Sequence, residues 1–332
     1  MFVVHSYAVA VFLAFITMLC WGSWANTQKL ATKKWPFQLF YWDYAIGVLL
    51  LSLLMAFTVG SIGTEGRSFM ADLSQAEFSA LGSAFLGGVV FNIANLLLVA
   101  AIAIAGMAVA FPIGIGLALA LGVIVNYIAT PLGNPVLLFI GVAFVVVAIV
   151  LDAMAYKKLP GQTESPTKGI LVSLFAGLLM GFFYRFVAAS MVSDFVNPEA
   201  GRLTPYTASV VFAVGLLVSN FLWNSIFMYK PLAGERVTYR DYLKSGDAKL
   251  HSIGILGGAI WSLGFTVNII AAEQAGFAIS YGLGQGATMV AALWGVFIWK
   301  EFKGAKGVTG LLTAMFLFFA VGLALIIAAR LY

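Results

Sequence analysis

The chain has 332 residues, of which 62% are hydrophobic and only 9% are charged, and its mean hydropathy is +1.01. Soluble domains carry about 25% charged residues, so this composition excludes an ordinary soluble protein and indicates a chain whose solvent is a lipid bilayer. The net charge of +5 does not indicate a nucleic-acid partner, because the basic residues lie between apolar runs, where they determine membrane topology.

Apolar runs long enough to cross a membrane recur along the whole chain. A spanning helix needs roughly 20 such residues, and ten runs of about this length leave no room for a separate soluble domain. The first run lacks a basic leader and a small-residue cleavage site, so we interpret it as a spanning helix rather than a removable signal peptide. The predicted spans are residues 6–27, 37–60, 79–104, 107–129, 135–156, 169–191, 206–228, 252–273, 277–299 and 307–330.

Basic residues are divided unequally between the two sides of the membrane. The connections after the first, fifth, seventh and ninth spans hold Lys29, Lys33, Lys34, Lys157, Lys158, Lys168, Lys230, Arg236, Arg240, Lys244, Lys249, Lys300, Lys303 and Lys306. The other side holds Arg67, Arg202 and Arg330. Because lysine-rich loops stay in the cytoplasm, we expect a multi-pass protein of the cell membrane (inner or plasma) with both termini outside.

The chain also repeats itself. A shift of 170 residues superimposes the third and fourth spans on the eighth and ninth without a gap, so that Gly87, Gly88, Gly106 and Gly114 meet Gly257, Gly258, Gly276 and Gly284. We therefore predict two five-helix repeats, residues 1–158 and 169–332, joined by a short cytoplasmic linker, 159–168. Five is an odd number, so the second repeat must be inverted. Inverted repeats are typical of alternating-access carriers, which bind their substrate near the midplane.

Several motifs resemble one family of membrane carriers. Residues 20–24 (CWGSW), the Asp43-Tyr44 pair, 87–95 (GGVVFNIAN), 122–127 and 257–301 are similar to segments of the ureide permeases, and more distantly to glucose/ribose porters and rhamnose–proton symporters. The resemblance implies the EamA-like fold of the drug/metabolite transporter superfamily: all-α, with ten helices in two inverted five-helix repeats. It also implies a solute such as a ureide, nucleobase or sugar. The central loop of about twelve residues, 156–168, is shorter than that of the plant family members.

Polar and aromatic residues in the first repeat supply candidate substrate contacts. Trp21 and Trp24 lie three residues apart on one helix face, where indoles could stack on a flat ring or sugar; the alternative is an aromatic belt at the membrane interface. Asn92 and Asn95 lie in the middle of the third span, where an amide needs a partner. That partner is either a substrate or a neighbouring helix.

The second repeat supplies comparable candidates at similar depth: Trp261, Asn268, Tyr281 and Gln285. Tyr281 and Gln285 are four residues apart and share a helix face. Under the repeat shift Gln285 meets Ile115, so the symmetry is broken at a polar residue. This favours Gln285 as part of an asymmetric binding site.

Placing a charged residue inside a membrane span costs free energy, so each such residue is a candidate for a functional role. Arg185 shares a face with Gly177 and Gly181, which predicts that it points into the protein to bind a substrate or a carboxylate; the alternative is a side chain that reaches the outer interface. Three carboxylates, Asp43, Asp152 and Glu273, lie near span ends. We select Asp43, which is flanked by aromatic residues, as the candidate for proton coupling; the alternative is an interfacial ion pair.

The leading functional hypothesis is a permease that moves a small neutral polar solute, with a proton as the candidate coupling ion. A sugar uptake porter is the close alternative. An exporter is disfavoured because no glutamate lies deep in a span, and a channel because it would require charged rings or carbonyl filters. Two histidines at span ends and one cysteine form no catalytic or metal-binding constellation. We therefore expect no enzyme activity, no catalytic residues, no metal and no cofactor.

Overall fold

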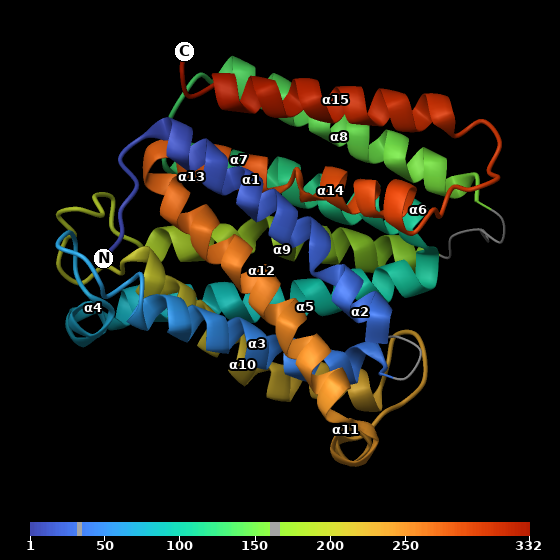
Figure 1. Ribbon diagram of the computed structural model, residues 1–332, viewed down its shortest axis with the longest axis horizontal. Helices are drawn as coiled ribbons and strands as arrows, with labels where there is room; N and C mark the ends of the chain where they lie inside the picture. The colour runs from blue at the N-terminus through green and yellow to red at the C-terminus, as the bar shows by residue number, and fades with distance from the viewer. Residues whose placement is uncertain (32–34, 160–166) are drawn as a thin grey trace.

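The computed structural model describes residues 1–31, 35–159 and 167–332, which form a helical bundle (Figure 1). Ten helices of the described part are long and apolar enough to cross a membrane, so the predicted all-α architecture with ten spans is confirmed. The predicted linker, 159–168, falls mostly on residues 160–166, which lie outside the described residues, and the two boundaries next to it remain predictions.

The first five spans contain two interruptions. The first span consists of α1 (Tyr7–Ser23) and α2 (Ala25–Ala31), and the fourth consists of α6 (Met107–Ala110), a π-helical turn η1 (Phe111–Ile115) and α7 (Gly116–Ala129). Pro112 lies in this turn, and π turns are frequent at functional sites. The remaining helices are α3 (Phe37–Phe57), the short α4 (Phe69–Gln75), α5 (Phe78–Ala105) and α8 (Pro135–Lys157).

The second five spans are interrupted mainly in the ninth. It consists of α13 (Phe277–Gly284), α14 (Ala287–Leu293) and a second π-helical turn, η2 (Trp294–Ile298). The remaining helices are α9 (Thr167–Ser190), α10 (Pro205–Tyr229), the short α11 (Tyr239–Ser245), α12 (Ala248–Ala275) and α15 (Thr309–Ala328). N-terminal capping residues determine where two of these helices begin. The Thr238 and Asp241 side chains form a capping box for α11, and Asp247 caps α12.

The same succession of elements appears in both repeats. Helices α4 and α11 each have 7 residues, and α5 and α12 each have 28. Both long helices end at a glycine with positive φ, 75° at Gly106 and 84° at Gly276, a conformation that favours glycine. Because α4 and α11 lie at opposite ends of the bundle (Figure 1), the second repeat is inverted relative to the first, as predicted.

Close helix crossings also obey this symmetry. A Cβ atom at Gly88 of α5 would lie 2.0 Å from a backbone oxygen of α10, and one at Gly258 of α12 would lie 1.9 Å from a backbone oxygen of α3. Gly215 and Gly47 occupy the partner helices at the same two crossings, where a Cβ would lie 2.2 and 2.0 Å from a backbone oxygen. Small residues allow helices to approach closely in a membrane, so glycine sets the spacing at both crossings.

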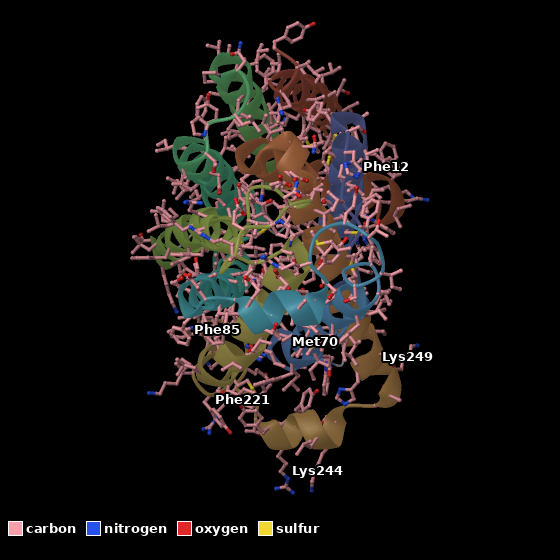
Figure 2. All side chains as sticks on the ribbon, turned by 90° about the vertical axis from the view of Figure 1, so that its left-hand side faces the viewer. Phe12, Met70, Phe85, Phe221, Lys244 and Lys249 are labelled. Carbon is pink, nitrogen blue, oxygen red and sulfur yellow. The ribbon has the colours of Figure 1, made fainter. Side chains whose placement is uncertain are left out.

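Large apolar side chains cover the circumference of the bundle. Phe12 is 63% exposed and Phe221 is 65% exposed, and both point outward when the bundle is viewed along its length (Figure 2). Exposed aromatic and aliphatic side chains on spanning helices are suited to lipid contact. This places the helices across the bilayer and the short connections at its two surfaces.

We name the two ends of the bundle by what lies there. The terminal face carries both chain termini and α4, and the basic face carries α2, α11 and the residues that follow η2 (Figure 1). An even number of spans puts both termini on one side, and the lysine-rich connections on the other. Assignment of the basic face to the cytoplasm rests on the distribution of basic residues and stays a prediction.

Candidate functional site

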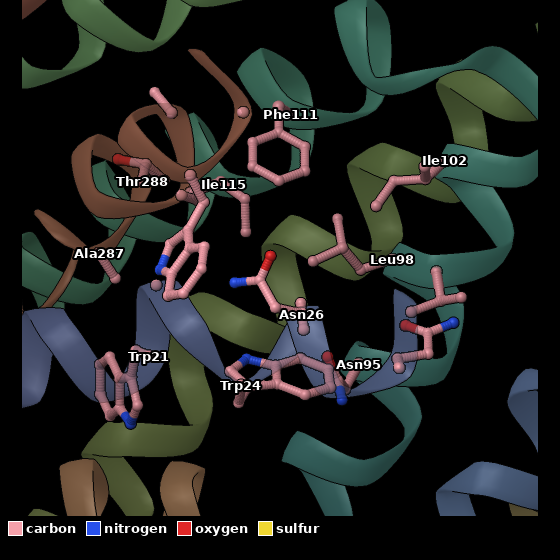
Figure 3. A pocket seen from close by; sticks show the side chains of 18 of the residues that line it. Trp21, Trp24, Asn26, Asn95, Leu98, Ile102, Phe111, Ile115, Ala287 and Thr288 are labelled. Atoms are coloured by element: carbon pink, nitrogen blue, oxygen red, sulfur yellow. The ribbon is translucent and has the colours of Figure 1, made fainter. Parts of the chain in front are cut away.

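A cavity of about 400 Å³ lies between the two repeats (Figure 3). Its lining comes from α1, α2, α5, η1, α8 and α9, and from α12, α14 and η2. Its deep end is formed by mid-span residues such as Phe91 and Trp261, and its mouth by residues of the basic face such as Lys29 and Glu301. The volume falls within the roughly 300–1,000 Å³ of small-molecule sites.

Aromatic rings form the deep end of the cavity. The Trp21 ring stacks on the Trp261 ring, with 5.8 Å between centroids and 11° between planes, and its Nε1 donates a hydrogen bond to the Trp261 carbonyl oxygen at 3.3 Å. The Phe91 ring lies 4.4 Å from the Trp261 ring. Phe91 and Trp261 are equivalent in the two repeats, so the repeats jointly build this aromatic wall.

An interrupted helix delivers Gln285 to the cavity. Helix α13 ends at Gly284 and α14 begins at Ala287, which leaves Gln285 in the break. The Gln285 side chain lines the cavity, and its amide has no hydrogen-bond partner among the described residues. Discontinuous helices beside a cavity are typical of carrier binding sites, and an amide without a protein partner is available to a solute.

Asn95 and Trp24 complete the polar and aromatic lining near this break (Figure 3). The Asn95 Nδ2 donates to the Tyr41 hydroxyl at 3.2 Å, while its Oδ1 accepts no hydrogen bond from the described part of the chain. Trp24 lies at the junction between α1 and α2 and contacts the Tyr44 ring at 4.9 Å. Trp24 and the residues that follow this junction, Ala25, Asn26, Gln28 and Lys29, line the cavity.

Three other predicted contacts bond to the protein itself and do not line the cavity. Asn92 Nδ2 donates to the Ser219 hydroxyl at 2.8 Å, which ties α5 to α10. Asn268 Oδ1 accepts from the Tyr184 hydroxyl at 2.7 Å. Tyr281 donates to carbonyl oxygens of α7 and α9 at 3.2 Å. These three side chains are buried, and their geometry is that of bonds between helices.

Arg185 also lies outside the cavity lining. Gly177 and Gly181, on the same face of α9, pack against η1 and α7, so this face is an interhelical face as predicted. Arg185 itself is half-buried and forms no ion pair with a carboxylate in the described ranges. A role in substrate binding stays a prediction for this residue.

Asp43 is buried in a hydrogen-bonded cluster at the basic face, away from the cavity. Its carboxylate accepts from Trp35 Nε1 at 3.1 Å and from the Tyr242 hydroxyl at 2.6 Å, and it lies 2.8 Å from His251 Nδ1. Burial, together with the bond to this carboxylate, raises the pKa of the Tyr242 hydroxyl above its usual range, which keeps it a donor. The cluster joins α3, α11 and α12.

The cavity mouth holds polar residues that the sequence analysis did not select. Tyr156 donates to Glu301 Oε2 at 2.8 Å, and Lys29 forms an ion pair with Glu301 Oε1. Asp152 lines the same wall one helical turn before Tyr156. The i, i+4 spacing of Asp152 and Tyr156 at the end of an apolar run was the available signal, but nothing in the sequence pairs this helix end with Glu301.

Comparisons with known proteins agree with this architecture. The family model described as "Ureide permease" matches residues 40–163 and 161–329. Ureide permease 4 of Arabidopsis thaliana is 23% identical, with 99% of each chain covered, and the glucose uptake protein GlcU of Bacillus subtilis (strain 168) is 25% identical, with 96% of each chain covered. A crystal structure, titled only as that of a protein, shares the fold with a TM-score of 0.60 at 14% identity and covers 97% of this chain and 98% of its own.

Proposed function

The chain belongs to the ureide permease family of membrane transporters, as its motifs predicted, and we propose that it carries a small neutral polar solute through the central cavity by alternating access. It is a transporter rather than an enzyme. The observation that carries the proposal is the unpartnered Gln285 amide at a helix break, facing an aromatic wall in the cavity between the inverted repeats.

The deep end of the cavity suits an uncharged ring. Trp21 and Trp261 offer indole surface, and Gln285 and Asn95 offer amide groups, while the charged side chains of the lining lie toward the mouth. An amide donates and accepts at once, so it can pair with the alternating N–H and C=O groups of a ureide or nucleobase. It can equally bind the hydroxyls of a sugar while an indole covers the apolar ring face.

Relatives of both kinds support keeping two solute classes. Matched relatives are named ureide permeases, and another is named a glucose uptake protein. We place ureides and nucleobases first because a planar amide ring satisfies the aromatic wall and both amides together. A sugar is the second candidate.

Closure of the terminal face supports alternating access. Arg67 donates to the carbonyl oxygens of Pro198, Glu199 and Arg202 at 2.8–2.9 Å and to Asp72 Oδ1 at 2.9 Å. The cavity lining reaches Lys29 and Glu301 at the basic face, whereas the bonds of Arg67 join the connections of the terminal face. With the basic face in the cytoplasm, this arrangement favours an inward-open state.

Coupling to a proton gradient is the finer part of the proposal. Asp43, the candidate from the sequence, does not line the cavity, and its carboxylate is instead surrounded by three hydrogen-bonding side chains. Its part in coupling remains a prediction, which Asp43→Asn tests in a transport assay.

A thermal-shift screen of the purified protein tests the solute class. Binding to the folded state raises the Tm by mass action, so a true solute among ureides, nucleobases and monosaccharides should raise the Tm of the wild type in a concentration-dependent way. The same solute should give a smaller shift for Gln285→Ala. An equal shift in both proteins would place the solute elsewhere.

A further inference from the structure

We propose that Asp152 is the proton-binding site through which this carrier couples solute movement to a pH gradient, with Glu301 as the neighbouring carboxylate that tunes it. The inference rests on the proposed carrier function and adds the residue that binds the coupling ion. It derives from the cavity wall at the mouth, where Tyr156 of α8 and Lys29 of α2 both bond to Glu301 in the segment after η2.

The charges at this wall do not balance. Asp152 and Glu301 both line the cavity and interact electrostatically with each other, whereas Lys29 is the cation that pairs with Glu301. Lys29 also lies 4.3 Å from the centroid of the Trp299 ring, which further fixes its position. With both carboxylates ionised, the described residues of this wall carry one surplus negative charge, which a single proton would neutralise.

The surplus charge falls on Asp152. Its side chain is 6% exposed, and its Oδ1 is buried without a hydrogen-bond partner in the described residues. Asp43 is similarly buried, but its carboxylate has three hydrogen-bond partners. Asp43 and Asp152 therefore differ in their hydrogen bonds rather than in their burial. An ionised carboxylate without partners is costly to bury, while the protonated acid is far cheaper, and the cavity connects this group to water at the basic face.

Glu301 is held rigidly beside it. Its backbone N–H donates to the Gly295 carbonyl oxygen at 3.0 Å, and its Oε2 accepts from Tyr156. A Cβ atom at Gly295 would lie 3.0 Å from both Glu301 Oε2 and the Tyr156 hydroxyl oxygen, so glycine leaves room for this pair. Tyr156 comes from the same helix face as Asp152, and the second carboxylate is therefore fixed next to the first.

Within residues 1–31, 35–159 and 167–332, no other titratable group is paired with Asp152. Among the elements packed against α8, helices α6 and α15 and the turn η1 carry none, and α7 carries only Tyr127, which bonds to Gly133 at the terminal face. Lys157 is exposed at the end of α8, and Lys158 bonds to the Gly307 carbonyl oxygen. Lys300 and Lys303 are exposed beyond Glu301.

A proton fits this site better than a metal cation. The described residues contain no group of three or more His, Cys, Asp or Glu side chains suited to hold a metal, and the oxygens of the neighbouring Glu301 are already bonded to Tyr156 and Lys29. One carboxylate oxygen without a partner needs only a proton. Because the group lies on the wall of the transport path, it can take a proton from water on one side and return it to water on the other.

The test uses the full chain in proteoliposomes, with radiolabelled uracil, allantoin and glucose as probes. For the wild type we expect gradient-driven accumulation of the transported probe, and proton entry on its addition, followed with a trapped pH dye. Asp152→Asn mimics the protonated acid but cannot release a proton. It should keep solute-for-solute exchange, which needs no proton release, and lose accumulation and proton entry at least tenfold. Asp152→Glu should restore both.

Two further variants keep the outcome decisive. Glu301→Gln removes the neighbouring negative charge and frees Lys29 to pair with Asp152, so the pH profile of accumulation should move to lower pH. Asp43→Asn distinguishes the two candidate carboxylates: it loses accumulation only if Asp43, rather than Asp152, binds the coupling proton. Normal accumulation by Asp152→Asn, loss of accumulation in Asp43→Asn alone, dependence on a sodium gradient, or wild-type accumulation that does not respond to the pH gradient would each overturn the proton site. Absence of saturable wild-type exchange for every probe would instead overturn the proposed function.

Discussion

Gln285 and Asn268 both carry amide side chains and belong to the second repeat, and they differ in their hydrogen-bond partners. Asn268 bonds to Tyr184 and donates to the Ser280 carbonyl oxygen at 2.9 Å, whereas the Gln285 amide faces the cavity. Helical spacing placed both at the right depth from the sequence alone. Spacing does not reveal whether a neighbouring helix supplies a partner, and this is why Asn92, Asn268 and Tyr281 were selected together with true lining residues.

We predict that substitution separates these two roles. Gln285→Ala should weaken solute binding by about 1–3 kcal/mol, roughly a 5- to 150-fold higher Kd, and leave the Tm nearly unchanged. Asn268→Ala should lower the Tm, because it leaves buried partners unsatisfied. Isothermal titration calorimetry measures the Kd, and thermal unfolding in the same detergent measures the Tm. A large loss of Tm in Gln285→Ala would assign that amide to the fold instead.

Five of the residues selected from the sequence as substrate contacts line the cavity. These residues are Trp21, Trp24, Asn95, Trp261 and Gln285, and two of them, Trp24 and Gln285, stand between helical segments. The cluster of Asp152, Tyr156 and Glu301 was missed because its members come from different repeats. Long-range pairing of this kind is set by tertiary packing, which a single sequence does not display.

At the scale of helices, the spans were predictable and their interruptions were not. Length and apolarity located ten helices, and the 170-residue shift located their symmetry. The breaks at Trp24 and Gln285 and the turns η1 and η2 lie inside runs whose average hydropathy still predicts one continuous span, so a window average carries no signal for them. The short helices α4 and α11 fell within predicted connections, because seven residues are too few for a periodic pattern.

The glycine crossings give an element-scale prediction. Gly88→Ala and Gly258→Ala should each destabilise the protein by about 1–3 kcal/mol or more, since the added methyl group would force α5 from α10 or α12 from α3. Gly82→Ala is the matched control on α5, because a Cβ there meets no atom within 4 Å. Thermal unfolding in detergent measures all three. Equal Tm values for Gly82→Ala and Gly88→Ala would contradict the packing.

At the scale of the whole molecule, the orientation in the membrane follows from charge. We predict that α4 faces the outside and α11 the cytoplasm. Cys20 is the single cysteine, so Cys20→Ala provides a background for Met70→Cys on α4 and Lys244→Cys on α11. In intact cells a membrane-impermeant maleimide should label Met70→Cys, and Lys244→Cys only after permeabilisation. The reverse pattern would invert the topology.

The central claim is that this member of the ureide permease family is a carrier whose cavity between inverted repeats binds a neutral polar solute. Counterflow in proteoliposomes tests it most directly, because only a carrier accelerates entry of a labelled solute when unlabelled solute fills the lumen. We predict a transient overshoot of the labelled solute in the wild type, and in Gln285→Ala at low solute concentration an initial rate lower by roughly 5- to 150-fold, in proportion to the weaker binding. Entry that neither saturates nor responds to lumenal solute would contradict it.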